Sequence, residues 1–106
     1  MQVTQIFLSD HGKEPEGILK NFRQSVIRAF PNASCILYKN QEAETFLNQH
    51  FDQRIINAYK KLVPYAYKAD LLRQCVLMIK GGWYVDLGMY CPLSLSYLSV
   101  CADVQR

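Results

Sequence analysis

Residues 69–86 constrain the fold more than any other part of this 106-residue chain. The first half of this run carries apolar residues at helical spacing, namely Ala69, Leu72, Cys75, Val76 and Ile79. Gly81-Gly82 then supplies the residue type that most easily adopts the left-handed backbone conformation that ends helices. The next five residues, Trp83-Tyr84-Val85-Asp86-Leu87, are typical of a strand. The run therefore predicts a helix over 65–80, a glycine turn and a strand over 83–87.

Short apolar segments alternate with helical patterns upstream of this run. Residues 3–8 and 34–38 are compact, apolar and bounded by turn signals, which predicts two strands. Residues 16–30 place apolar side chains on one helical face. Strands that alternate with helices favour an α/β architecture with a mostly parallel sheet, and three helices between strands leave room for insertions.

Capping signals mark the expected helix ends. Pro15 suits the first turn of the helix over 16–30, and Asn40 can cap the helix that follows the second strand. Asp52 can cap a third helix, which Pro64 would end. In the tail, residues 93–97 alternate as an edge strand would, but the pattern breaks at Leu98, and the sequence leaves the tail undecided.

Composition argues against several classes of protein. Half of the residues are hydrophobic and a fifth are charged, which fits one folded domain. The net charge is only +3 and the basic residues are scattered, so nucleic-acid binding gains little support. Neither the histidines nor the cysteines have the spacing of a zinc site; the cysteines are Cys35, Cys75, Cys91 and Cys101.

Location is also inferred from the sequence. The N-terminus does not resemble a signal peptide, and no apolar stretch approaches the roughly 20 residues that span a bilayer. We therefore expect a cytoplasmic protein with no transmembrane segment and with reduced thiols.

Three charged residues are expected at one edge of the sheet. Asp86 follows the predicted strand at its carboxyl end, where open parallel sheets bind ligands. Arg73 lies seven residues before Lys80, about 10 Å along a helix. Asp86 lies three residues after Trp83, roughly 10 Å along a strand. Because helix and strand run antiparallel through the glycine turn, Asp70, Arg73 and Asp86 should reach the same level.

Two carboxylates and one guanidinium at one rim can form a sugar-phosphate site, since carboxylates accept from vicinal hydroxyls and arginine pairs with phosphate. The same residues also have an ordinary explanation. Asp70 and Arg73 could be an exposed ion pair, and Asp86 a cap or turn former. Tyr84 shares a strand face with Asp86, so it either lines the pocket or packs in the sheet.

The motif Ala69-Asp70-Leu71-Leu72-Arg73, with Gly81-Gly82-Trp83-Tyr84-Val85-Asp86, resembles the core signature of the sugar transferases that contain a DXD motif. That family includes mannosyltransferases, capsular polysaccharide transferases and clostridial glucosylating toxins. The likeness runs in order from about Val3 to Leu93. It implies a GT-A-like nucleotide-diphospho-sugar transferase fold of the α/β class. Residues 1–106 would be a single domain, the N-terminal, nucleotide-sugar-binding half of that fold, with a helical insertion.

The resemblance also implies roles for individual residues. Asp70 and Arg73 would hold hydroxyls of the donor sugar and its diphosphate side. Asp86, as the first acid of the motif, would contact the ribose or sugar and reach a metal. Phe7 would lie near the nucleotide base, although a core aromatic is the commoner case on a first strand. The donor would be of the UDP-hexose or GDP-mannose type, the acceptor a saccharide or other hydroxyl, and the reaction retaining.

Two departures from the family pattern bear on catalysis. Gly88 stands where the family has its second acid, so a Mn²⁺ or Mg²⁺ site would be weakened or lost, and Asp103 is too distant to be assigned as a substitute. The chain also ends at Arg106, whereas family domains continue. The alternatives are a catalytically impaired nucleotide-sugar-binding remnant, or a structural α/β module that self-associates through its apolar tail.

Overall fold

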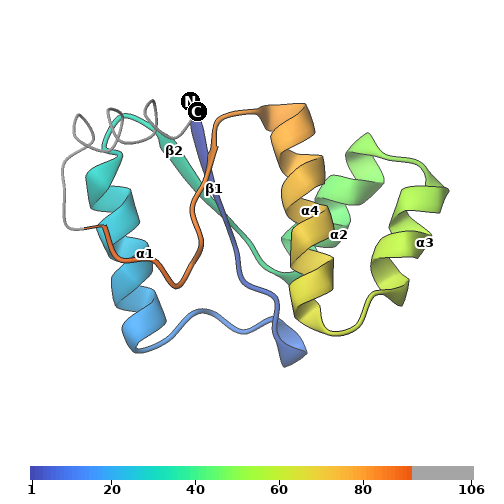
Figure 1. Ribbon diagram of the computed structural model, residues 1–106, viewed down its shortest axis with the longest axis horizontal. Helices are drawn as coiled ribbons and strands as arrows, with labels where there is room; N and C mark the ends of the chain where they lie inside the picture. The colour runs from blue at the N-terminus through green and yellow to red at the C-terminus, as the bar shows by residue number, and fades with distance from the viewer. Residues whose placement is uncertain (92–106) are drawn as a thin grey trace.

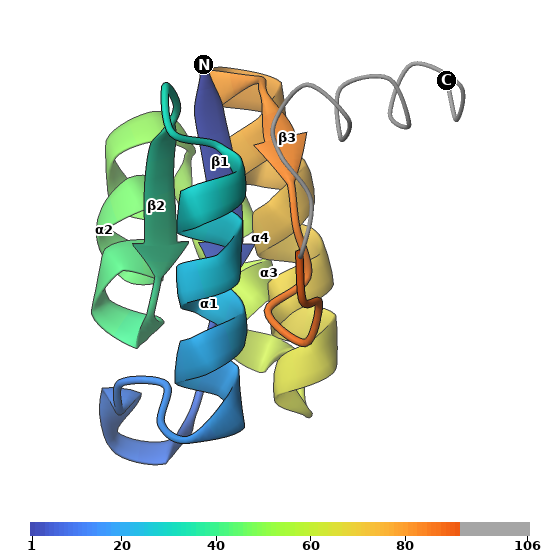
Figure 2. The same ribbon diagram turned by 90° about the vertical axis from the view of Figure 1, so that its left-hand side faces the viewer.

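The computed structural model describes residues 1–91, in which a small sheet has helices on both faces (Figures 1 and 2). The elements in chain order are β1 (Gln2–Ile6), the 3-10 helix η1 (Asp10–Gly12), α1 (Ile18–Ala29), β2 (Ser34–Tyr38), α2 (Asn40–His50), α3 (Gln53–Lys61), α4 (Tyr65–Lys80) and β3 (Trp83–Tyr84). The alternation confirms the α/β class.

The sheet has the order β2-β1-β3, and both pairings are parallel, as expected. The central strand β1 is paired along its whole length with β2, from Gln2 opposite Ser34 to Ile6 opposite Tyr38. On its other side β1 pairs only with Trp83 and Tyr84 of β3. The backbone N–H of Val85 still donates to the Thr4 carbonyl oxygen at 3.0 Å, which extends this pairing by one residue. All three strands therefore end at the same edge.

Helices cover the two faces unequally. Helix α1 lies on one face, while α2, α3 and α4 lie on the other (Figure 1). The larger cluster, on the face of α2 to α4, contains Ile6, Tyr38, Ala43, Phe46, Leu47, Ile56, Tyr59, Leu72, Cys75 and Val76. The smaller cluster, on the face of α1, contains Val3, Val26, Ala29, Phe30, Val85 and Cys91. Residues of β1 alternate between the two clusters, as side chains of a strand must.

The glycine turn between α4 and β3 forms as predicted. Gly81 ends the helix with φ +65°, and Gly82 follows with φ +80°. A Cβ atom at position 82 would overlap the carbonyl oxygen of Gln2, so β1 passes directly against this turn. Glycine is required at position 82 for both its conformation and its lack of a side chain.

The predicted end of the third strand is wrong. The strand over 83–87 was expected to continue, but β3 ends at Tyr84 and a turn follows, in which the N–H of Met89 donates to the Asp86 carbonyl oxygen at 3.0 Å. Ile79, expected on the buried face of α4, is 42% exposed because it lies in the last turn, beyond the core.

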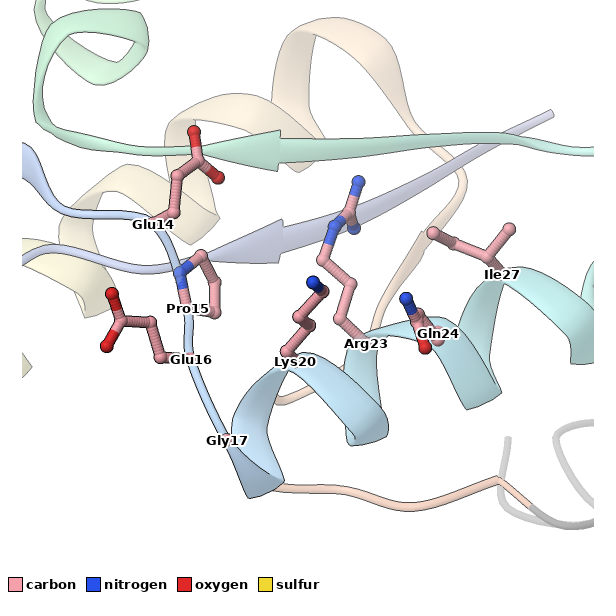
Figure 3. A pocket seen from close by; sticks show the side chains of 8 residues that line it. All are labelled: Glu14, Pro15, Glu16, Gly17, Lys20, Arg23, Gln24 and Ile27. Carbon is pink, nitrogen blue, oxygen red and sulfur yellow. The ribbon is translucent and has the colours of Figure 1, made fainter.

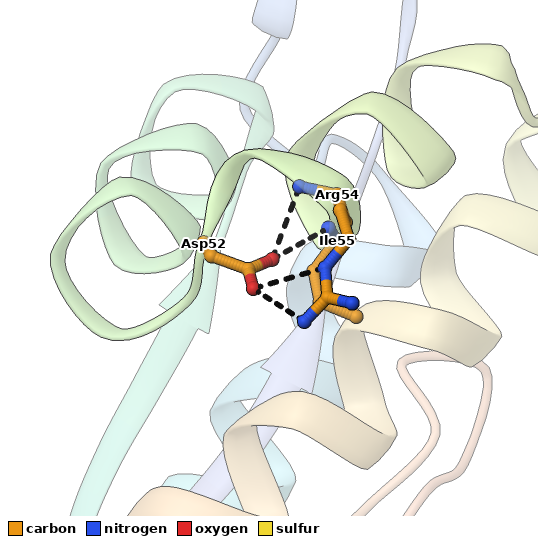
Figure 4. A network of polar contacts seen from close by, with 3 residues as sticks. All are labelled: Asp52, Arg54 and Ile55. Atoms are coloured by element: carbon orange, nitrogen blue, oxygen red, sulfur yellow. Dashed lines mark hydrogen bonds and ion pairs between the residues drawn. The ribbon is translucent and has the colours of Figure 1, made fainter.

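Two of the three caps also differ from expectation. Asp52 caps α3 as predicted, accepting from the backbone N–H groups of Arg54 and Ile55 (Figure 4). The cap of α2 is Lys39 rather than Asn40, because the Asn40 side chain bonds to Ser9 instead. Pro15 precedes the first turn of α1, whose N-cap is Gly17.

Several expectations fall on residues outside the described part of the chain. These are the edge strand over 93–97, the self-association through the tail, and any role of Cys101 or Asp103. Among residues 1–91, no helix is both long enough and apolar enough to cross a membrane.

Candidate functional site

The carboxyl edge of the sheet brings α4 and the end of β3 together. Helix α4 leads into β3 through the glycine turn, so its N-terminal half returns to the edge at which β1, β2 and β3 end (Figure 1). Asp86 lies two residues beyond β3 at this edge, and it is exposed. Because ligands of open parallel sheets bind outside the carboxyl ends of the strands, this edge is the candidate site.

Arg73 joins the helix side of the site to the strand side. Its guanidinium carbon lies 5.5 Å from the centroid of the Tyr84 ring, within the range of a cation–π contact. Its Nη2 lies 3.9 Å from Oδ1 of Asp70, which is an ion pair but too long for a hydrogen bond. Arg73 thus rests on Tyr84 while its N–H groups stay available to a ligand.

The pKa of Tyr84 is influenced by burial and by the charges of Asp86, Arg73 and Asp70. Burial raises the pKa of the Tyr84 hydroxyl, the carboxylates of Asp86 and Asp70 raise it further, and the Arg73 guanidinium opposes them. The tyrosine therefore stays protonated at neutral pH and can both donate and accept a hydrogen bond. The structure thus brings Arg73 against Tyr84 and Asp70, with Asp86 near enough to act on the Tyr84 hydroxyl; the ligand roles of these residues stay a prediction.

The charge of this four-residue group limits what it can bind. Two carboxylates and one guanidinium give a formal charge of −1, and the side chains of Asp70 and Arg73 are 69% and 38% exposed. Exposed carboxylates are good acceptors for the hydroxyls of a sugar or a ribose. A bare diphosphate would be attracted to Arg73 but repelled by both acids. The group therefore fits a ligand that has hydroxyls facing the acids and phosphate only at the arginine.

Asp70 and Asp86 are the two carboxylates that the four-residue group offers to a divalent cation. Magnesium and manganese favour several oxygen ligands, usually including one or two carboxylates. Within residues 1–91, no three His, Cys, Asp or Glu side chains are grouped so that they could hold a metal. Gly88 stands near Asp86 and contributes no ligand, although a Cβ atom there would meet no other atom within 4 Å. The metal role expected of Asp86 stays a prediction.

Phe7 does not lie in the four-residue group. It follows the last residue of β1, its N–H donates to the Tyr38 carbonyl oxygen at 2.9 Å, and its side chain is half-buried. Phe7 thus lies at the same edge, near the end of β2. Its assignment to a nucleotide base stays a prediction.

Sequence reasoning missed the residues that fix the loop after β1. Oδ1 of Asn40 accepts from the Ser9 N–H at 3.0 Å, while its Nδ2 donates to the Ser9 carbonyl oxygen at 2.7 Å. The hydroxyl of Tyr65 donates to Oδ1 of Asp10 at 2.8 Å. These bonds hold the loop from both α2 and α4. The partners are 31 and 55 residues apart, so no local pattern could have revealed them.

Comparison with known proteins settles the family. Residues 18–103 match the model of the glycosyltransferase sugar-binding region containing the DXD motif. The chain belongs to this glycosyltransferase family. An uncharacterized glycosyltransferase of Acanthamoeba polyphaga mimivirus is 27% identical over 93 residues, which are 88% of this chain and 37% of the viral protein. No solved structure matches the chain.

The match confirms the resemblance seen in the signature motif, and the parallel sheet with its helices is compatible with a GT-A-like domain. The family region includes all of α4 and β3, and with them the four-residue group. The matched residues span only 37% of the length of the viral relative. The activity of a whole enzyme is therefore not shown by these residues.

Proposed function

We propose that this chain binds a nucleoside-diphosphate sugar and forms the donor-binding part of a retaining hexosyltransferase. The donor would be of the UDP-hexose or GDP-mannose type, and the acceptor a saccharide or another hydroxyl compound. The observation that carries the proposal is the group of Asp70, Arg73, Tyr84 and Asp86 at the carboxyl edge of a parallel sheet.

Each member of the group has a separate part in donor binding. Asp70 and Asp86 accept hydrogen bonds from hydroxyls of the sugar and the ribose. Arg73 pairs with a diphosphate oxygen, and its resting place on the Tyr84 ring limits the conformations that it must lose when it binds. Phe7, at the end of β1, would contact the base.

Arg73 would also assist transfer of the sugar. Breaking the bond between the sugar and the diphosphate builds negative charge on the leaving oxygen, and a positioned guanidinium stabilises that charge. Gly88 stands in place of the second acid, and no three His, Cys, Asp or Glu side chains are grouped within residues 1–91, so the proposal gives a metal no step. Any cation that binds would do so weakly, with Asp86 as its protein ligand.

A second candidate is favoured by Gly88. A chain without the second acid could bind the donor without transferring the sugar, as a catalytically impaired nucleotide-sugar-binding remnant. The two candidates share the donor site, but they differ in metal dependence and turnover. Donor binding that EDTA leaves unchanged, with neither hydrolysis nor transfer, favours the remnant; release of the sugar from the donor favours the transferase.

Calorimetric titration with UDP-glucose and GDP-mannose tests donor binding. We expect saturable binding of one of them, weakened about tenfold or more by Arg73→Gln and by Asp86→Asn, since each removes a charged hydrogen-bonding partner. Arg28→Gln is the matched control, because Arg28 is an exposed arginine on α1. Absence of binding with both donors, with and without Mn²⁺, would reject the proposed function.

A further inference from the structure

A hollow of about 600 Å³ lies beside α1, where the loop before the helix meets its first turns (Figure 3). Lys20 and Arg23 stand three residues apart on the same side of α1, and both line the hollow. The four-residue donor group lies on the other side of the sheet, against α4 (Figure 1). The hollow is therefore a separate place in the molecule.

Arg23 is held rigidly by neutral partners. Its Nη1 donates to Oε1 of Gln5 at 2.9 Å, and its Nη2 donates to the Cys35 carbonyl oxygen at 3.3 Å. A guanidinium has five N–H donors, so three remain after these two bonds. Within residues 1–91 no carboxylate lies within ion-pairing distance of Arg23. Burial lowers the pKa of Arg23, and the charges of Cys35 and Glu14 oppose this shift without cancelling it.

The acids in the same hollow do not cancel this charge. Glu14 forms an ion pair with Lys39, which neutralises it. Glu16 is exposed and points away from Arg23 (Figure 3). Once Glu14 is counted with Lys39, the two cations Lys20 and Arg23 exceed the single acid Glu16 by one positive charge.

The N-terminus of α1 adds to the positive potential. Its N-cap, Gly17, lines the hollow and makes no side-chain cap bond, and the first turn contains no acidic residue. The first N–H groups of the helix thus have no side-chain acceptor at the cap, and a helix end of this kind carries about half a positive charge. The summed positive charge of Lys20, Arg23 and this helix end suits a dianion better than a monoanion.

An unpaired donor lies beside the arginine. Gln5 is fully buried, and its Nε2 has no hydrogen-bond partner among residues 1–91. Oε1 of the same amide accepts from Arg23. Exchanging Oε1 and Nε2 by a flip of the amide would therefore place an N–H donor against the N–H donor of Arg23. Buried donors are normally paired, so an acceptor beside the Arg23 guanidinium would be favourable, although Gln5 itself does not line the hollow.

We propose that this hollow is a binding site for a phosphate-type dianion, held by Arg23 and Lys20 at the N-terminus of α1. The ligand class is a phosphate monoester or inorganic phosphate. The site does not depend on the proposed donor function, because no residue is shared between them.

Titration of the full chain with inorganic phosphate, followed by amide NMR at constant ionic strength, tests the site. We expect saturable shifts of the amides at residues 17–20, with acetate and chloride giving weaker, non-saturating shifts. Lys20→Gln and Arg23→Gln should each weaken phosphate binding about tenfold. Arg28→Gln, on the same helix but outside the hollow, and Arg73→Gln, in the donor group, should leave it unchanged.

Lys20 is exposed, so Lys20→Gln keeps the test decisive even if Arg23→Gln fails to fold. Glycerol 3-phosphate and vesicles that contain phosphatidic acid present the same group free and on a lipid surface. Binding to either one that requires Lys20 supports the site and identifies the source. Phosphate shifts equal to those of chloride, or binding that Lys20→Gln leaves unchanged, would overturn the proposal.

Discussion

The two faces of the sheet differ in what their helices bury. The face beneath α2, α3 and α4 has a large apolar cluster that includes Leu72, Val76 and Tyr59. The face beneath α1 has a smaller apolar cluster and two buried polar side chains with long-range bonds, Gln5 and Ser25. Gln5 holds Arg23, and Ser25 accepts from the N–H of Cys91 at 2.9 Å.

This difference suggests that the two faces of the sheet have different roles. Apolar burial contributes most of the stability of a domain, and it increases with the area removed from water. Buried hydrogen bonds contribute less net stability, but they fix particular atoms in place. We therefore expect the α4 face to stabilise the fold. The α1 face should instead position a cation and the segment that follows β3.

The largest expected effect is on the α4 face. Leu72→Ala removes a side chain with no exposed area from the centre of the larger cluster. It should lower the free energy of unfolding by about 3–5 kcal/mol, through lost transfer energy and a cavity. Chemical denaturation measures this loss. Val26→Ala, on the α1 face, should cost roughly 2 kcal/mol. An equal loss of stability in Leu72→Ala and Val26→Ala would contradict the different roles of the two faces. Ile79→Ala, exposed on the same helix as Leu72, is the control.

Alkaline pH should also weaken the α4 face. Burial, followed by the negative charge of Glu44, raises the pKa of Tyr59 from 10 to about 12. The folded state then holds the phenolic proton more tightly than the unfolded state. The stabilisation is present below pH 10 and is lost between about pH 10 and 12, at roughly 2–3 kcal/mol. Denaturation at several pH values should show this loss, and Tyr59→Phe should reduce it. An unchanged pH profile in Tyr59→Phe would assign the loss to other groups.

A smaller effect is expected from Ser25 on the α1 face. Ser25→Ala leaves the buried N–H of Cys91 without its acceptor, which should cost about 1–2 kcal/mol. Hydrogen exchange of the Cys91 amide should accelerate more than that of Val76, because the loss is local. If both amides accelerate equally, Ser25 stabilises the whole fold and does not specifically anchor the segment after β3.

The smallest effect on stability is expected at Gly88. A side chain there has open space, and its φ lies outside the left-handed region, so Gly88→Asp should change stability by less than about 0.5 kcal/mol. The new carboxylate would lie near Asp86 and should make donor binding depend on Mn²⁺. Calorimetry with and without EDTA measures this, and Gly88→Asn is the matched neutral control. No gain in metal dependence would count against position 88 as the place of the second acid.

Much of the α4 region could be predicted because its signals are local. The bounds of α4 match the expected 65–80, since Pro64 and Gly81 set both ends within the sequence itself. The approach of Asp70 to Arg73 follows from helical spacing. The end of β3 was missed because a turn follows it, closed by the N–H of Met89 on the Asp86 carbonyl oxygen, even though β1 itself continues to Ile6. Beyond Val85 no further pairing with β1 is present among the described residues.

The sequence by itself determined the helices, the glycine turn and the helical spacing that brings Asp70 to Arg73, because each depends on residues close along the chain. The tertiary structure alone decided that β1 is the central strand, that Tyr84 supports Arg73, and that Asn40 and Tyr65 hold the loop after β1. It also placed Gln5 against Arg23, which lines the hollow beside α1. Those contacts join residues as far apart in the chain as Val3 and Trp83. They form only when burial of the two apolar clusters compensates for the entropy of closing the loops between them.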